Sequence, residues 1–305
     1  MINKKKGLLL VLFTAVISGF SIFINSFAVK GLDSSVFTFS KNVIVALFLL
    51  SILFFFGQLK ELKGLNAKQW SNLALMGLIG GSIPFLLFFK GLQITTGQTS
   101  AFIHKTIFIY VAIFAVIFLK ERLTYKHLIA ASLLMAGNFL LIFPDFNFSK
   151  GHLLILLATV FWAAENVLAK KVLKELNGNI VAFGRMFFGS LFILLFLALT
   201  QKLPLIAFMS QQQYLWIIVT SLFLLLYVFA YYNGLKQIEV TTAACILSLG
   251  SVITALLNFL NGSSVNIMES MGMLLITLGI ISLLWISHLK EFIIHLFKGE
   301  THERY

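Results

Sequence analysis

Residues 7–29, GLLLVLFTAVISGFSIFINSFAV, and residues 151–173, GHLLILLATVFWAAENVLAKKVL, decide the fold of this chain. Each is a largely apolar run of 23 residues. As a helix that rises about 1.5 Å per residue, such a run crosses a hydrocarbon core of roughly 30 Å. Both runs begin with glycine and share several leucines at a constant offset of 144 residues. A spanning helix that recurs halfway along the chain predicts a duplicated membrane protein.

The composition places the chain in the same class. Hydrophobic residues make up 59% of its 305 residues, charged residues make up 11%, and 33 residues are Phe. A chain this apolar is unsuited to a water-soluble domain and predicts an all-α polytopic membrane protein. Ten apolar runs are long enough to span, at residues 7–29, 36–56, 69–91, 97–118, 127–143, 151–173, 180–200, 213–235, 241–260 and 268–287.

Polar positions repeat together with the apolar ones. The loop residues 33–35 (DSS) align with 177–179 (NGN), and residues 88–92 (FFKGL) align with 231–235 (YYNGL). Because each repeat has five spans, an odd number, the second repeat must enter the membrane with opposite polarity. We therefore expect ten transmembrane helices in two inverted five-helix repeats, an arrangement typical of secondary transporters. The predicted boundaries are 1–145 and 151–290 for the repeats and 291–305 for a cytoplasmic tail.

The basic residues predict the orientation. If the N-terminus is cytoplasmic, the cytoplasmic loops and tails hold 16 Lys and Arg residues, and the outer loops hold only Lys30, Lys150 and Lys202. By the positive-inside rule both termini are then cytoplasmic, in a multi-pass protein of the cell membrane. The net charge of +12 is mostly this topology signal, and nucleic acid is not an expected partner because no basic groove interleaved with aromatic residues is present.

The sequence offers little for cofactor chemistry. Cys245 is the only cysteine, so an internal disulfide and a multi-cysteine metal site are excluded. No phosphate-binding loop is present, and ATP hydrolysis by this chain is therefore not expected. No cluster of His, Asp and Glu has the spacing of a metal site. We expect neither a cofactor nor a metal.

The run FLKERLT at residues 118–124 closes the fourth span. Together with ten spans, five-plus-five repeats and a basic residue early in the second and seventh spans, it resembles the EamA-type members of the drug/metabolite transporter superfamily. In that family the Leu-x-Glu-Arg-Leu-Thr run often recurs in the ninth span. Here residues 260–264 (LNGSS) lack the Glu. The resemblance implies a transporter of small metabolites and does not choose among amino acids, other metabolites and drugs.

Charged side chains inside apolar spans mark the candidate site, because a buried ion costs several kcal/mol unless it is hydrated or paired. Lys41 and Arg185 hold equivalent places in the two repeats, five residues inside a span. Lys105 lies near mid-bilayer beside His104, whereas Lys90 lies at the outer end of a span and is expected to reach the headgroups. The excess of cations favours an anionic substrate group, which we expect Lys41 and Lys105 to bind.

Glu165 is the one acidic residue far from the ends of a predicted span. The helical rise places Glu165 and Arg185 in the inner third of the membrane on consecutive helices, so the two are candidates for an ion pair. Such a pair either orients two helices or serves in gating or coupling. Inversion places Lys41 in the outer third, with no acidic partner on the equivalent helix. His104 either lines a cavity or is a buried neutral histidine with a backbone partner.

Uncharged groups complete the predicted lining. We expect Trp162, Asn166 and Tyr231 to contact substrate, with further hydrogen-bonding groups from Asn25, Gln98, Tyr227 and Tyr232. For each aromatic side chain taken singly, lipid contact or interfacial anchoring is the alternative. Pro84 interrupts the third span and predicts a kink that serves packing or gating.

These observations predict a secondary active transporter, an exporter or exchanger, of small organic metabolites such as amino acids or organic anions, working by alternating access. The alternative is an intramembrane enzyme that acts on a lipid, with Glu165 and His104 as its acid and base. The expected partners are a small-molecule substrate and the lipid bilayer. A homodimer is left open, with spans five and ten as its candidate faces because they carry small residues such as Ala130, Ala131, Gly272 and Gly279.

Overall fold

The computed structural model describes residues 3–142 and 149–299, and in these residues it contains helices and no strand. Nine helical segments of this part are long and apolar enough to cross a membrane, and α8 is a shorter apolar helix, so the ten predicted spans are confirmed. In chain order the spans are α1 (Lys4–Ala28), α2 (Ser34–Phe55), α4 to α5 (Ala67–Gln93), α6 to η3 (Gly97–Leu119), α8 (Tyr125–Ile142), α9 (Lys150–Val172), α10 (Gly178–Leu199), α11 (Gln211–Leu235), α12 to α13 (Val240–Leu260) and α14 (Ile267–Gly299).

The ends of the spans follow the sequence closely, with one exception. Helix α14 continues to Gly299, well past the predicted end at residue 287, so the predicted tail 291–305 is helical as far as that residue. Of the predicted connector 144–150, only Ser149 and Lys150 lie within the described residues, and they form the beginning of α9. A short helix, α3 (Leu59–Lys63), lies in the loop that follows α2.

The internal repeat is visible in the helix caps. The carboxylate of Asp33 accepts the backbone N–H of Ser35 at 2.9 Å and so caps α2. At the equivalent place in the second repeat, the side-chain oxygen of Asn177 accepts the backbone N–H of Asn179 at 3.0 Å and caps α10. A side-chain oxygen before the first turn satisfies N–H groups that have no partner within the helix. The aligned polar triplets therefore perform the same local function in both halves.

Three of the spans are interrupted in the middle. The third contains a π-helical turn followed by Pro84, and the fourth and ninth each break at one residue, Thr106 and Ser248. The hydroxyl of Ser248 donates to the backbone carbonyl of Lys105 at 3.3 Å, so the two broken spans touch where they break. The pieces are α4 (Ala67–Met76), η2 (Gly77–Ser82), α5 (Ile83–Gln93), α6 (Gly97–Lys105), α7 (Ile107–Phe114), η3 (Ala115–Leu119), α12 (Val240–Leu247) and α13 (Leu249–Leu260).

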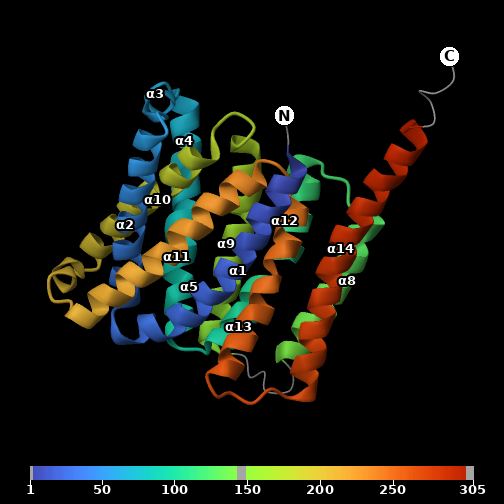
Figure 1. Ribbon diagram of the computed structural model, residues 1–305. Helices are drawn as coiled ribbons and strands as arrows, with labels where there is room; N and C mark the ends of the chain where they lie inside the picture. Colours follow the sequence, from blue (N-terminus) through green and yellow to red (C-terminus); the bar gives the residue numbers. More distant parts are fainter. Residues whose placement is uncertain (1–2, 143–148, 300–305) are drawn as a thin grey trace.

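Helices of one repeat pack mainly against helices of the other. Helix α1 lies against α11 and α13, α2 lies against α10, and α5 lies against α9. Figure 1 shows the blue α1 running beside the orange α11 at the centre of the bundle. The interior between the repeats is therefore enclosed by both halves of the chain, which is the position of the binding site in transporters built from inverted repeats.

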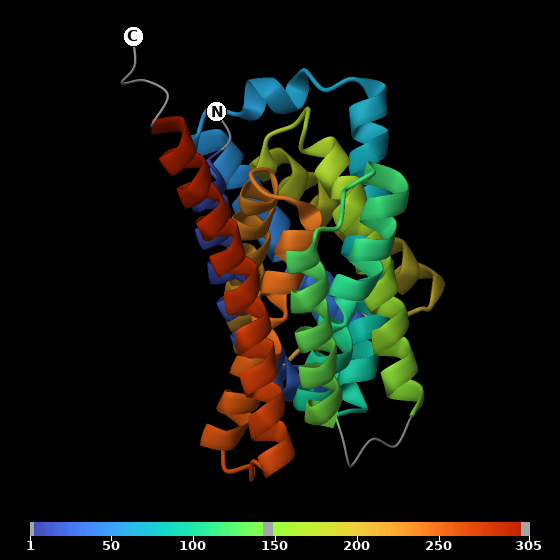
Figure 2. The same cartoon turned by 90° about the vertical axis from the view of Figure 1, so that its right-hand side faces the viewer.

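Helices α8 and α14 form a separate pair along one flank of the bundle (Figures 1 and 2). Small residues allow close approach of the two backbones: a Cβ on Gly137 would lie 2.7 Å from the Gly272 carbonyl, and one on Gly279 would lie 3.2 Å from the Ala130 carbonyl. Three of the small residues expected at a dimer face, Ala130, Gly272 and Gly279, thus pack within the chain. A homodimer through these helices would instead use exposed large side chains such as Met135 and Leu274.

Candidate functional site

A cavity lies in the middle of the bundle and takes its lining from both repeats. Its volume is about 80 Å³, and one water needs roughly 10–15 Å³ by the same kind of measure, so it holds several waters or a small solute. Seven of the eight predicted site residues lie in its wall: Lys41, His104, Trp162, Glu165, Asn166, Arg185 and Tyr231. The sequence therefore identified most of the polar lining, although it did not show how the residues are paired.

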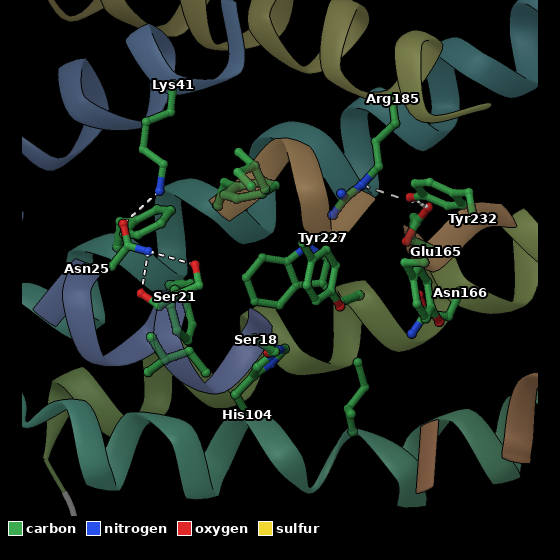
Figure 3. A pocket seen from close by; sticks show the side chains of 18 residues that line it. Ser18, Ser21, Asn25, Lys41, His104, Glu165, Asn166, Arg185, Tyr227 and Tyr232 are labelled. Carbon is green, nitrogen blue, oxygen red and sulfur yellow. Dashed lines mark hydrogen bonds and ion pairs between the residues drawn. The ribbon is translucent and has the colours of Figure 1, made fainter. Parts of the chain in front are cut away.

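Lys41 enters the cavity from α2 (Figure 3). Its ammonium donates to the side-chain oxygen of Asn25 at 2.7 Å and lies 4.8 and 4.6 Å from the ring centres of Phe37 and Phe89. The amide nitrogen of Asn25 donates in turn to the backbone carbonyl and the hydroxyl of Ser21, which holds the amide oxygen toward the lysine. The ion pairs among the described residues do not include Lys41. The positive charge of this buried side chain thus has no carboxylate partner.

Arg185 lies at the other end of the cavity (Figure 3) and is already engaged. Its Nε lies 3.9 Å from Oε1 of Glu165, so the expected ion pair is confirmed, and Nη2 donates to the Gly80 carbonyl at 2.9 Å. The hydroxyl of Tyr232 donates to the same carboxylate oxygen at 2.6 Å. Because Glu165 balances Arg185, the unbalanced charge in the cavity wall belongs to Lys41.

The break in the third span explains how Gly80 becomes an acceptor for other helices. Pro84 has no N–H, so the carbonyl four residues earlier, that of Gly80, loses its helical partner. That carbonyl accepts Nε1 of Trp162 at 2.9 Å as well as Nη2 of Arg185. The kink expected at Pro84 is thus present and has a local consequence: it fixes two residues of the cavity wall. The position of a proline four residues after a glycine was the signal in the sequence.

Aromatic side chains form the middle of the wall. The ring of Trp162 lies 4.8 Å from that of His104 and 5.3 Å from those of Phe85 and Phe88. Two buried polar atoms here have no hydrogen-bond partner among the described residues, Nδ1 of His104 and the hydroxyl of Tyr231. A buried polar group without a partner is costly, so these two atoms are the natural contacts for a bound solute or water.

Lys105 is the predicted site residue that lies outside the cavity wall. Its side chain is fully buried, and its ammonium donates to the hydroxyl of Ser18 at 2.6 Å. Ser18 itself lines the cavity, so the lysine lies one hydrogen bond behind the wall. The sequence did not single out Ser18 and Ser21, although their spacing with Asn25, three and four residues, places all three on one face of α1.

Comparison with known proteins agrees with this architecture. The EamA-like transporter family model matches residues 5–143 and 149–285. The uncharacterized transporter YyaM of Bacillus subtilis strain 168 is 25% identical, over 78% of this chain and 79% of its own. An uncharacterized transporter in the cobO 3' region of Sinorhizobium sp. is 28% identical, over 37% of this chain and 79% of its own.

The fold recurs among solved structures as well. One crystal structure superposes with a TM-score of 0.73 at 16% identity, covering 92% of this chain and 98% of its own. At that identity the likeness concerns the fold alone. The family model, in contrast, matches nearly the whole chain in two consecutive segments that coincide with the two five-helix repeats. This chain is a multi-span membrane protein that belongs to the EamA-like transporter family.

Proposed function

We propose that this transporter moves a small organic solute with an anionic group, by secondary active transport and alternating access. The observation that carries the proposal is the unbalanced charge of Lys41 in the cavity wall. A buried ammonium held by one amide oxygen and two ring faces remains poorly compensated. A carboxylate beside it would complete the hydrogen bonds of the ammonium and offset its burial.

The rest of the wall suits the body of such a solute. Trp162, Phe85 and Phe88 offer ring faces and edges. Tyr231 and His104 offer polar atoms that have no hydrogen-bond partner in the part of the chain that the structure describes. A mostly apolar wall with a few directed polar groups is typical of sites for small amphipathic molecules. The expected substrate therefore has one anionic group near Lys41 and a ring or short apolar body toward Trp162.

Alternating access is supported by the way the repeats enclose the cavity. The pairs α1 with α11 and α2 with α10 join the two halves across it. Rocking one inverted repeat against the other exposes such a central site to each side of the membrane in turn. The energy then comes from solute and ion gradients, and the direction of transport follows them.

The test is uptake by proteoliposomes of three labelled compounds that share a phenyl ring: hippurate (anionic), phenylalanine (zwitterionic) and phenethylamine (cationic), with protein-free liposomes as the blank. We expect hippurate to be transported best. Lys41→Gln should reduce its uptake by roughly tenfold or more, since one charge-assisted contact in a dry site is lost. Lys90→Gln is the matched control, because Lys90 is exposed and lies outside the cavity wall. Preference for phenethylamine, or uptake that is insensitive to Lys41→Gln, would refute the proposal.

A further inference from the structure

Lys105 is a buried lysine that the proposed binding site does not use. Its side chain is fully buried at the break between α6 and α7. Of its three possible N–H donors, one has a hydrogen-bond partner among the described residues, the hydroxyl of Ser18. The ion pairs among the described residues do not include it. An ammonium with a single neutral partner in a dry interior is strongly disfavoured relative to the neutral amine.

We propose that Lys105 is the proton-binding site that couples transport: it is a neutral amine while the cavity is empty, and it takes up a proton when the anionic substrate binds. This inference rests on the function proposed above, since it requires an anion in the cavity. As an amine, Lys105 offers a lone pair that accepts the Ser18 hydroxyl hydrogen. As an ammonium, it donates to the oxygen of the same hydroxyl, so the 2.6 Å contact serves both states.

A polar face of α1 connects the proton site with the anion site. Lys105 bonds to Ser18, and Lys41 bonds to Asn25, whose amide nitrogen bonds to Ser21. Ser18, Ser21 and Asn25 all line the cavity (Figure 3). Waters or the substrate in the cavity therefore reach the hydroxyl that holds Lys105, which gives the proton a route that does not cross the apolar core.

The charged groups of the cavity wall determine the direction of the effect. His104 is the neighbour of Lys105 on α6, and the wall also receives Glu165 from α9, Lys41 from α2 and Arg185 from α10. Among the described residues, the other elements packed on α6 present no ionisable side chain beside Lys105. The residues beside it are Ser18 of α1 and Gly250 of α13. The ionisable side chains of the remaining elements are Lys90 at the exposed end of α5, Tyr110 of α7 and those in the first turn of α8.

In the empty cavity Glu165 is balanced by Arg185, so no carboxylate of the cavity wall is left to favour a proton on Lys105. An anion in the cavity supplies that negative charge and raises the proton affinity of Lys105. The proton comes from solvent on the open side and forms a third N–H bond on Nζ. On the opposite side the anion leaves, the N–H bond breaks and the proton passes to water. One anion and one proton then move in the same direction, and this cycle carries no net charge.

This scheme differs from the export or exchange expected from the sequence. A cycle in which anion and proton move together runs inward whenever the outside is the more acidic side. The direction of hippurate movement under an imposed pH gradient therefore separates co-transport from export driven by protons, in which the two would move in opposite directions.

The first experiment measures protons directly. Hippurate is added to the purified full-length protein in detergent and weak buffer, the proton uptake is read from the pH, and bound hippurate is measured by calorimetry in the same preparation. We expect about one proton taken up per bound hippurate for the wild type, and none for Lys105→Gln or for the permanently charged Lys105→Arg. Lys90→Gln, at an exposed residue outside the cavity wall, should retain the uptake. Absence of uptake in the wild type, or uptake that survives Lys105→Gln, would overturn the assignment.

A second variant keeps the test independent of Lys105 itself. A Cβ on Gly250 would lie 2.8 Å from Cε and 3.2 Å from Nζ of Lys105, and Gly250 is outside the cavity wall. Gly250→Ala should therefore displace the amine and lower the number of protons taken up per bound hippurate. An unchanged ratio in a folded Gly250→Ala protein would contradict the geometry on which the proposal stands.

Proteoliposomes then separate the two proposals. With acid outside, wild-type vesicles should accumulate hippurate, whereas Lys105→Gln should only equilibrate it. Hippurate exchange in the wild type without any response to the pH gradient would overturn the coupling and leave the proposed function standing. Hippurate that is neither bound nor exchanged would overturn both.

Discussion

Gly80 illustrates how much of the site depends on a single residue. Its carbonyl, released by Pro84, accepts from Trp162 and Arg185. Its missing side chain is equally important, because a Cβ at this position would lie 2.3 Å from Cγ of Glu165 and 3.0 Å from Nε of Arg185. The glycine therefore lets the ion pair approach the kinked helix, and the kinked helix in turn supplies the carbonyl that holds the arginine.

We expect Gly80→Ala to displace Glu165 and Arg185, to destabilise the protein by roughly 1–3 kcal/mol through overpacking, and to reduce hippurate uptake. Thermal unfolding in detergent and uptake by proteoliposomes measure the two effects. Gly31→Ala is the control, because a Cβ on Gly31 meets no atom within 4 Å. Equal behaviour of the two variants would show that the contact at Gly80 has no role.

At the scale of the elements, the clearest difference between the repeats is the way α12 begins. The carboxylate of Glu121 accepts the backbone N–H groups of Val240 and Thr241 at 3.2 and 3.4 Å, and also the Thr241 hydroxyl. A carboxylate at a helix N-terminus satisfies free N–H groups and interacts favourably with the helix dipole. Glu121 belongs to the FLKERLT run, so this run, at the end of the fourth span, caps the beginning of the ninth span.

The other repeat lacks this contact and compensates locally. The residue aligned with Glu121 is Ser264, within the LNGSS segment, and among the described residues α6 is capped instead by its own Thr96, which accepts the N–H of Thr99 at 3.2 Å. Other contacts do follow the repeat: Gln93 donates to the Leu32 carbonyl at 3.0 Å, and Lys236, its counterpart, donates to the Leu176 carbonyl at 2.9 Å. The N-terminus of α12 is thus capped by a carboxylate from another span, whereas that of α6 is capped by the hydroxyl of its own preceding threonine.

Glu121→Ala should free the first N–H groups of α12. We expect a loss of about 0.5–2 kcal/mol of stability, as for other helix caps, and faster hydrogen exchange at the amides of Val240 and Thr241. Mass spectrometry of peptides that cover residues 236–247 measures this exchange. Glu61→Ala serves as the comparison, since Glu61 is exposed in α3. Exchange at these amides that stays at the wild-type rate would mean that the cap is not functional.

At the scale of the whole molecule, one surface ion pair joins the two repeats near the C-terminal end of α1. The carboxylate of Asp33, just before α2, lies 2.8 Å from the ammonium of Lys202, which follows α10. Partial burial by itself would raise the pKa of Asp33, but Lys202 and the hydrogen bonds from Ser35 and Val36 outweigh it and bring the pKa below its ordinary value of 3.8. The charged form is therefore favoured by folding.

A depressed pKa gives stability that is present above the ordinary pKa of the carboxyl group and is lost as the pH falls through the lower pKa of the folded protein. We expect Asp33→Asn to melt at a lower temperature than the wild type at neutral pH, and the difference to disappear in strong acid. Lys202→Met should show a smaller deficit, because it retains the cap of α2. Melting curves between neutral and acidic pH test this, and a difference that persists in acid would point to another cause.

The candidate site was predictable only in part. Lys41, Glu165 and Arg185 are recognisable because a charge inside an apolar run is rare and costly wherever the helix faces. Lys105 looks the same in the sequence, yet it lies behind Ser18 and outside the cavity wall. The difference depends on the rotation of α6 against α1 and α13, which the apolar pattern of a nearly uniform helix does not specify. Likewise Ala130 and Gly279 read as an outer face and proved to be packed inside the chain.

The class of protein, the ten spans, their duplication and the likeness to a transporter family all follow from the amino-acid sequence. These depend on the length and apolarity of single segments and on the spacing of repeated residues, which the bilayer constrains one helix at a time. The pairing of the buried charges follows from the folded arrangement: Arg185 is paired with Glu165, and Lys41 has no ion-pair partner among the described residues. The fold likewise places the Gly80 carbonyl beside Trp162 and Arg185, and Lys105 one hydrogen bond from the cavity. Those outcomes depend on contacts of a few ångström between helices distant in the chain.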